Sequence, residues 1–167
     1  MLDYVDEHDH VLGQASRDEV HAKALMHRAT HIILLNSNRQ YFVQLRAMHK
    51  DNNPGVWDSS AAGHVDAGES YLDCASRELA EELGVRKAPS DFVEIGRMGP
   101  SEANGYEFVR IYGVVSDQSV TFADGEVVDG RWLSESELEH WLQQRPQDFA
   151  NTFGVIWDTI REWRDTH

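Results

Sequence analysis

The sequence predicts an α/β sandwich, in which helices pack on a β-sheet. Apolar strand-like runs stand both before and after a helix-forming segment at residues 69–83. Further helix patterns precede the first run and follow the last one. This mixed order of strands and helices is typical of layered α/β domains. With 167 residues and 41% hydrophobic content, the chain is long enough to bury a substantial core as one domain over residues 1–167.

The first part of the chain, residues 1–28, is predicted to be an accessory to this domain. Residues 4–14 favour two short strands that turn around His8 and His10. Ser16 and Glu19 then have the spacing of a capping box, which predicts a short helix over residues 17–25.

The central strands follow in pairs. Residues 30–35 and 40–46 flank a turn at 36–39 and predict a hairpin. Residues 56–64 predict a strand region that leads to Gly63. Longer strands are expected at 92–98 and 106–115, and another near 131–133.

Two helices close the chain. Ser134 and Glu137 form a second capping box, which predicts a helix through about residue 143. After Pro146, a helix over about 147–164 is expected, because large apolar residues repeat there at helical spacing. Such a stripe is more often core than binding surface. Its members are Phe149, Phe153, Ile156, Trp157, Ile160 and Trp163.

Composition narrows the classes of function. The formal net charge of -14 disfavours nonspecific binding to nucleic acid or to an anionic membrane. It leaves room for a phosphorylated substrate, since metal ions can supply local positive charge. The single cysteine, Cys74, permits no internal disulfide and reads as a small buried residue rather than a nucleophile. With no apolar run of 18 residues and no signal-like start, we expect a cytoplasmic protein.

Residues 63–85 carry the strongest chemical signal. As a helix, residues 69–83 place an apolar stripe toward the core, made of Leu72, Ala75, Leu79 and Leu83. Glu78, Glu81 and Glu82 are three and four residues apart, so their carboxylates share a neighbouring stripe. A solvated acidic face is one explanation. Because like charges repel there, a hard cation such as Mg²⁺ bound through oxygen ligands is the other.

The full spacing of this segment resembles the Nudix box of the Nudix hydrolase family at every defining position. Those positions are Gly63, Glu69, Arg77, Glu78, Leu79, Glu81, Glu82, Gly84 and Val85. At average residue usage, a chance match at a given start is below about 10⁻⁸. The resemblance implies the Nudix α/β/α fold with a mixed central sheet. It also implies a metal-dependent hydrolase of small-molecule diphosphates, with Mg²⁺ or Mn²⁺ as cofactor. It also implies a homodimer as one assembly, although the sequence leaves the oligomeric state open.

The resemblance also implies roles for single residues. The metal ligands would be Glu78, Glu81 and Glu82, and one of the three would act as base, with Glu78 favoured. Arg77 would orient Glu78, and Glu69 would support the loop and the metal shell. The backbone carbonyl of Ala62, beside Gly63, would complete the coordination.

Outside the box, residues 5–30 and 43–58 resemble type I isopentenyl diphosphate isomerases and their hydrolase-like bacterial relatives. This resemblance implies that Arg46 and Lys50 contact the diphosphate, together with His64. It also matches an isomerase metal set of imidazoles and a carboxylate to His21, His27, His64 and Glu107. For each histidine we favour a structural or substrate-contact role over metal binding. Glu107 is kept as a metal ligand from outside the box, with Glu102 and Glu126 as competitors.

Two departures argue against isomerase chemistry. Ala62 stands at the position of the isomerase cysteine, and alanine cannot exchange protons. Glu78 and Glu81 are retained, whereas isomerases tend to lose them. Separately, Gly105 stands where the isomerase metal set has a second glutamate, so that set is incomplete. The leading hypothesis is therefore hydrolysis of a diphosphate linkage in a nucleoside diphosphate derivative or related small molecule. An isomerase-like enzyme and a noncatalytic ligand-binding module remain the alternatives.

Overall fold

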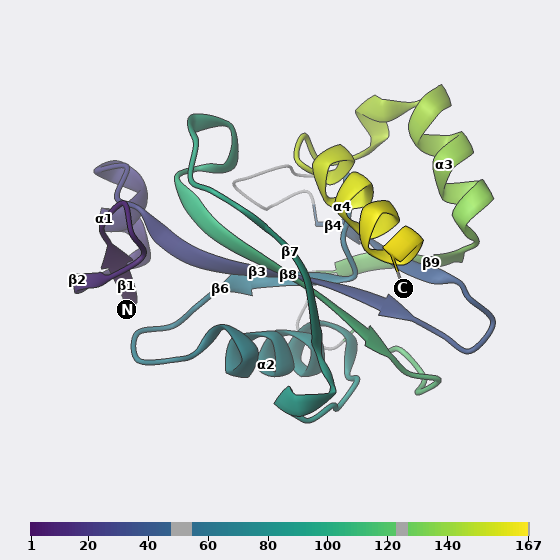
Figure 1. Ribbon diagram of the computed structural model, residues 1–167, viewed down its shortest axis with the longest axis horizontal. Coiled ribbons are helices and arrows are strands. Elements are labelled where there is room, and N and C mark those ends of the chain that lie inside the picture. Colours follow the sequence, from purple (N-terminus) through teal and green to yellow (C-terminus); the bar gives the residue numbers. More distant parts are fainter. Residues whose placement is uncertain (48–54, 123–126, 167) are drawn as a thin grey trace.

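The computed structural model describes residues 1–47, 55–122 and 127–166, and its centre is a mixed β-sheet (Figure 1). The strand order is β5-β4-β3-β8-β7, with β6 paired to β3 and β9 paired to β4. The strands are β3 (His27–Leu35), β4 (Tyr41–Arg46), β5 (Trp57–Asp58), β6 (Ala61–His64), β7 (Val93–Met98), β8 (Glu107–Val115) and β9 (Val127–Leu133). Strands β3 and β8 run parallel and the other pairs run antiparallel, so the predicted mixed sheet is confirmed.

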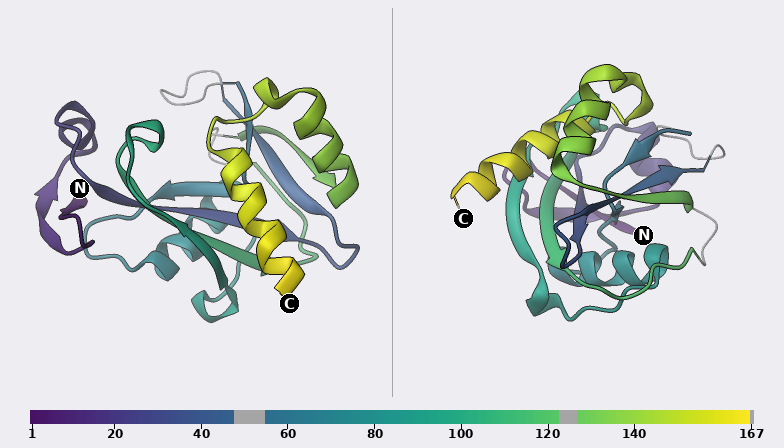
Figure 2. Two further views of the ribbon diagram at one scale, coloured as in Figure 1. Left: turned by 45° about the horizontal axis from the view of Figure 1, so that its top comes forward. Right: turned by 90° about the vertical axis from the view of Figure 1, so that its right-hand side faces the viewer.

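Helices cover both faces of this sheet (Figures 1 and 2). Helix α2 (Tyr71–Leu83) packs on one face, where Leu79 and Leu83 meet Ile32 and Tyr112 in one apolar core. Helices α3 (Glu135–Gln144) and α4 (Phe153–Thr166) cover the other face through a second core. Five residues of the predicted C-terminal stripe are buried in it: Phe149, Phe153, Ile156, Trp157 and Ile160.

The N-terminal residues form a separate two-stranded sheet and a short helix at one end of the molecule (Figure 1). Strands β1 (Leu2–Val5) and β2 (Val11–Ala15) confirm the predicted hairpin. Helix α1 (Arg17–Ala22) is shorter than predicted. Ser16 caps it by accepting from the Glu19 N–H at 3.1 Å, whereas the Glu19 carboxylate accepts from Lys23 Nζ at 2.6 Å.

The region predicted as one strand at 56–64 is two strands, because the sheet forks along β3. Residues 29–32 of β3 pair with β6, while its last residue, Leu35, pairs with Tyr41 of β4. The buried Ser60 lies at the fork. Its hydroxyl accepts from the Leu34 N–H at 2.7 Å and donates to the Phe42 carbonyl at 2.6 Å. Ser60 thereby satisfies two backbone groups that the diverging strands leave unpaired.

Two helices begin later in the chain than predicted. Helix α2 begins at Tyr71 rather than at residue 69, and Tyr71 takes the buried position that was predicted for Leu72, which is 37% exposed. The C-terminal helix begins at Phe153, because the chain after Pro146 first makes a short 3₁₀ turn, Pro146–Asp148. Among the described residues, no helix is long and apolar enough to cross a membrane.

Candidate functional site

Capping residues fix both ends of the box helix α2. The Ser70 hydroxyl accepts from the Asp73 N–H at 3.1 Å, and Gly84 ends the helix in the left-handed region at a φ of 67°. A glycine takes this conformation without the steric cost of a Cβ. These two caps fix where the helix begins and ends. The helix packs beside β6, so its glutamates lie next to that strand.

Arg77 is the centre of the carboxylate cluster. Its Nε and Nη2 atoms donate to the two oxygens of Glu69 at 2.8 and 2.9 Å. Its Nη1 donates to Glu78 at 2.7 Å and to Glu81 at 3.2 Å, and Nη2 also reaches the His64 carbonyl at 3.1 Å. One guanidinium thus joins the loop before the helix, the helix itself and strand β6. This fixed fork geometry is the property that distinguishes arginine from lysine.

Glu78 is packed directly against Gly63. A Cβ added at Gly63 would collide with the carboxyl group of Glu78, so only glycine leaves room for it. Burial raises the pKa of Glu78 to about 7, an effect that Arg77 opposes and that Glu81 and Asp66 reinforce. This carboxyl can therefore exchange a proton near neutral pH, as a general base must.

The other two glutamates differ in exposure. Glu82 is buried, and its Oε2 accepts from the Ala62 N–H at 2.8 Å. Glu81 has a side chain that is 53% exposed. The structure therefore brings the three predicted carboxylates to one side of α2, from a buried position at Glu82 to an open one at Glu81.

The donor atoms here suit a hard divalent cation. Glu78, Glu81 and Glu82 offer only carboxylate oxygens, and the glycine at position 63 makes room for the carboxyl group of Glu78. Oxygen ligands are those that Mg²⁺ and Mn²⁺ prefer. Glu69 differs from the rest, since both of its oxygens accept from Arg77.

A histidine cluster adjoins this site. Ligand nitrogens of His21, His27 and His64 all lie within 4.8 Å of one another. Glu107 faces the cluster, with its Oε2 at 2.9 Å from His64 Nε2 and 3.4 Å from His27 Nε2. Burial raises the pKa of Glu107, but the two histidines outweigh this effect and bring it to about 2.

The contacts of His27 Nε2 and His64 Nδ1 show which ring nitrogens of the cluster are engaged. The buried His27 Nε2 has no hydrogen-bond partner within the described ranges, while its Nδ1 contacts the Leu25 carbonyl at 2.9 Å. Arg17 Nη2 lies 2.9 Å from His64 Nδ1, which makes this nitrogen an acceptor and leaves the proton of a neutral ring on Nε2, facing Glu107. The sequence reasoning missed Arg17. No linear pattern marks it, because its partner is 47 positions away.

The remaining predicted residues are placed as follows. Arg46 ends β4, and its Nη1 lies 3.8 Å from Asp58 Oδ2. Glu102 is exposed in a 3₁₀ turn, Glu102–Asn104. Lys50 and Glu126 lie outside the described residues.

Cys74 is buried, as predicted. Burial raises the pKa of its thiol to about 12, and the sulfur lies 3.4 Å from Thr30 Oγ1. Such a thiol holds its proton at neutral pH, so it is unsuited to act as a nucleophile.

Comparisons with known proteins agree with this geometry. The NUDIX domain model matches residues 25–153. The "Uncharacterized Nudix hydrolase PA4841" of Pseudomonas aeruginosa is 38% identical over 133 residues, covering 80% of this chain and 78% of that protein. The "Uncharacterized Nudix hydrolase YfcD" of Escherichia coli K12 is 35% identical over 137 residues, covering 82% and 75%.

Among solved structures, the crystal structure of DR0079 from Deinococcus radiodurans superposes with a TM-score of 0.75 at 27% identity. The match covers 96% of this chain and 97% of that one. The predicted Nudix fold is thereby confirmed. The chain belongs to the Nudix hydrolase family.

Proposed function

We propose that this Nudix hydrolase cleaves a diphosphate linkage in a nucleoside diphosphate derivative or a related small molecule, with Mg²⁺ or Mn²⁺ as cofactor. The observation that carries the proposal is the carboxylate cluster around Arg77. In it Glu78 packs against Gly63 with a pKa of about 7, while the buried Glu82 of α2 accepts from the Ala62 N–H of β6. Nudix hydrolases generally use divalent metals, which supports the cofactor class.

Glu78, Glu81 and Glu82 would hold the cation, with Glu69, Glu107 and the Ala62 carbonyl as further oxygen ligands. A bound divalent ion would lower the pKa of a coordinated water and neutralise charge on the phosphates. Glu78 would accept the proton of the attacking water, a role supported by its low exposure and its position against Gly63. Arg77 would keep Glu78 in place through the 2.7 Å hydrogen bond between them.

Substrate contacts are proposed for Arg46, Lys50 and His64. An arginine fork and a lysine point charge are both suited to phosphate oxygens. Arg46 already lies within 3.8 Å of Asp58, so phosphate binding there would share the guanidinium with that carboxylate.

The test is a panel of diphosphate compounds assayed with Mg²⁺ and with Mn²⁺ separately. Hydrolysis predicts release of phosphate or of a nucleoside monophosphate, and chelation of the metal abolishes it. The variant Glu82→Gln should reduce turnover by a factor of about 10² or more. Its amide oxygen can still accept from the Ala62 N–H, so the fold is retained. Glu7→Gln is the matched control, because its side chain is 79% exposed. Near-normal turnover in Glu82→Gln would refute the assignment of Glu82.

Two other hypotheses are distinguished by the same panel. An isomerase-like enzyme would convert isopentenyl diphosphate to its allylic isomer without releasing phosphate. A noncatalytic module would bind a panel member and leave it intact. The retained box glutamates and the alanine at position 62 favour hydrolysis over both.

A second metal site at the histidine cluster is supported by one specific observation. The buried His27 Nε2 makes no hydrogen bond in the described part of the chain, although Glu107 Oε2 lies 3.4 Å from it. With His21, His64 and Glu107 it offers the mixed nitrogen and oxygen set that suits Zn²⁺ or Co²⁺. Glu107 would then be a ligand of this site in place of the box cluster. Co²⁺ titration should give visible absorption bands that His21→Ala weakens and Glu81→Gln does not. A spectrum insensitive to His21→Ala would remove this site.

A further inference from the structure

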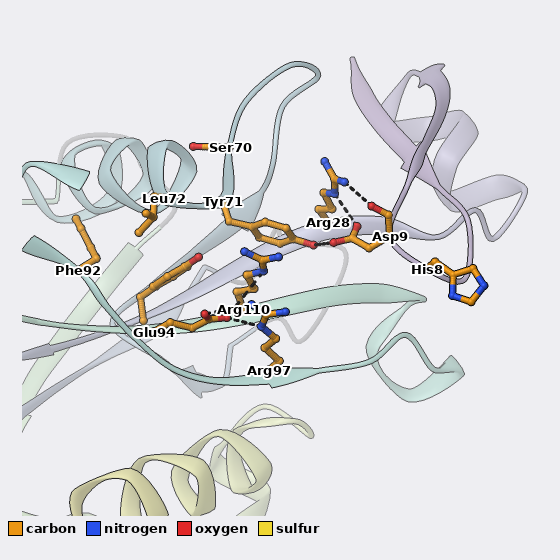
Figure 3. A pocket seen from close by; sticks show the side chains of 11 residues that line it. His8, Asp9, Arg28, Ser70, Tyr71, Leu72, Phe92, Glu94, Arg97 and Arg110 are labelled. Carbon is orange, nitrogen blue, oxygen red and sulfur yellow. Dashed lines mark hydrogen bonds and ion pairs between the residues drawn. The ribbon is translucent and has the colours of Figure 1, made fainter. Parts of the chain in front are cut away.

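A polar cavity of about 630 Å³ lies over β8 and β7, beside the first turn of α2 (Figure 3). It is separate from the carboxylate cluster. Glu78 packs against Gly63 of β6, which pairs with one side of β3, whereas β8 and β7 follow on the other side. Tyr71 and Leu72 of α2 form one wall of the cavity.

Two arginines stand directly opposite each other in this cavity. Arg97 of β7 is the register partner of Arg110 of β8 in the antiparallel pair. Like charges at such positions destabilise a sheet. One carboxylate serves both, since Glu94 accepts from Arg97 at 2.5 and 3.3 Å and lies 3.9 Å from Arg110 Nε. The pair therefore holds more positive than negative charge.

Contacts with Tyr71 and Asp9 hold Arg110 and Arg28 in place. The guanidinium of Arg110 lies over the ring of Tyr71, 4.0 Å from its centroid. The Tyr71 hydroxyl donates to Asp9 at 2.8 Å, and Asp9 accepts from Arg28 at 2.7 Å through its carboxylate. Figure 3 shows this chain of contacts extending from the N-terminal hairpin to the sheet. A preorganised cation of this kind loses little freedom when it binds an anion.

The charge of the cavity is opposite to that of the molecule. Its lining holds three arginines, Arg28, Arg97 and Arg110, against two carboxylates, Asp9 and Glu94. The whole chain has 15 Lys and Arg against 29 Asp and Glu. The charged groups of the lining therefore sum to +1, whereas the formal net charge of the chain is -14.

We propose that this cavity is a second anion-binding site, for a phosphate dianion that is either free or the monoester of a small molecule. Two guanidinium forks from neighbouring strands match the several oxygens and double charge of a phosphate better than a single carboxylate. The cavity volume lies in the range of small-molecule sites, about 300–1,000 Å³, and so leaves room for an ester group.

Isothermal titration calorimetry on the full chain, freed of divalent ions by passage over a chelating resin, tests the proposal. The probes are inorganic phosphate, AMP and acetate at low ionic strength. We expect saturable binding of phosphate or AMP and weaker binding of acetate. A preference between the first two identifies the source of the phosphate. The variant Arg97→Ala should weaken binding at least about tenfold, the factor expected for one charge-assisted hydrogen bond.

Arg145→Ala is the matched control. The side chains of Arg97 and Arg145 are both 62% exposed, and each pairs with a carboxylate three positions away. Loss of affinity in Arg97→Ala alone would support the site. Equal losses in both variants, unchanged affinity in Arg97→Ala, equally tight binding of acetate, or no saturable binding would each overturn it.

Discussion

Replacing Gly63 by alanine tests how the structure positions the Glu78 carboxyl. A Cβ at position 63 would collide with the carboxyl carbon and Oε1 of Glu78 and lie 2.7 Å from its Cγ, where ordinary contacts begin at 3.4 Å. Glu78 must therefore move by at least about 0.7 Å. Its side chain is only 13% exposed and is tied to Arg77, so it cannot simply turn into solvent.

Gly63→Ala should lower the unfolding free energy modestly and the turnover strongly. Overpacking of a buried contact costs about 1–3 kcal/mol of unfolding free energy. A misplacement of about 1 Å in a catalytic group lowers the rate about 10²-fold. Denaturant unfolding measures the first quantity, and steady-state hydrolysis of the best panel substrate measures the second. We expect a folded protein whose turnover is reduced by two orders of magnitude.

Gly99→Ala is the control, because a Cβ at Gly99 meets nothing within 4 Å. It introduces the same methyl group without touching the cluster. If Gly63→Ala retained activity within twofold of Gly99→Ala, the claim that Gly63 makes room for a catalytic carboxyl would be wrong.

Two further predictions concern buried side chains. The raised pKa of Cys74, about 12, leaves only about 10⁻⁴ of the thiol ionised at pH 8. In the folded protein a disulfide reagent should therefore react orders of magnitude more slowly than in urea, with a rate that still rises above pH 10. Ser60→Ala should lower the free energy of unfolding by about 2–4 kcal/mol, because it leaves the buried Leu34 N–H and Phe42 carbonyl without their hydroxyl partner.

Each of these two predictions has a clear contrary result. Rapid labelling of Cys74 in the native protein at pH 8 would show that its environment is more open than the buried contacts indicate. Ser119→Ala, at an exposed position, is the control for Ser60→Ala. Equal unfolding free energies for the two serine variants would remove the role of Ser60 at the fork of the sheet.

The spacing of residues in the sequence was enough to predict the box, whereas the rotation of α2 on the sheet depends on tertiary packing. The three glutamates lie on one side of α2 because helical geometry alone fixes that relation. Periodicity does not fix the rotation of the helix against the sheet, and Tyr71 is buried where Leu72 was predicted to be. Both residues lie near the edge of the apolar stripe, so periodicity could not choose between them.

Contacts between residues far apart in the sequence could not be predicted from it. The fork along β3 depends on where two other strands leave it, which the continuous run at 56–64 does not reveal. The contact of Arg17 with His64 requires the N-terminal helix to dock at the end of the sheet. The opposed pair of Arg97 and Arg110 depends on strand register, which a bulge between Glu94 and Gly96 shifts.

The measurement that tests the central claim most directly is hydrolysis of the best panel substrate in H₂¹⁸O, followed by mass spectrometry of the phosphorylated products. Water directed at phosphorus by the box cluster predicts one ¹⁸O in one phosphoryl product, formed only when a divalent cation is present and lost in Glu82→Gln. Products without label, or equal turnover in a chelated sample, would contradict metal-assisted attack of water on a diphosphate.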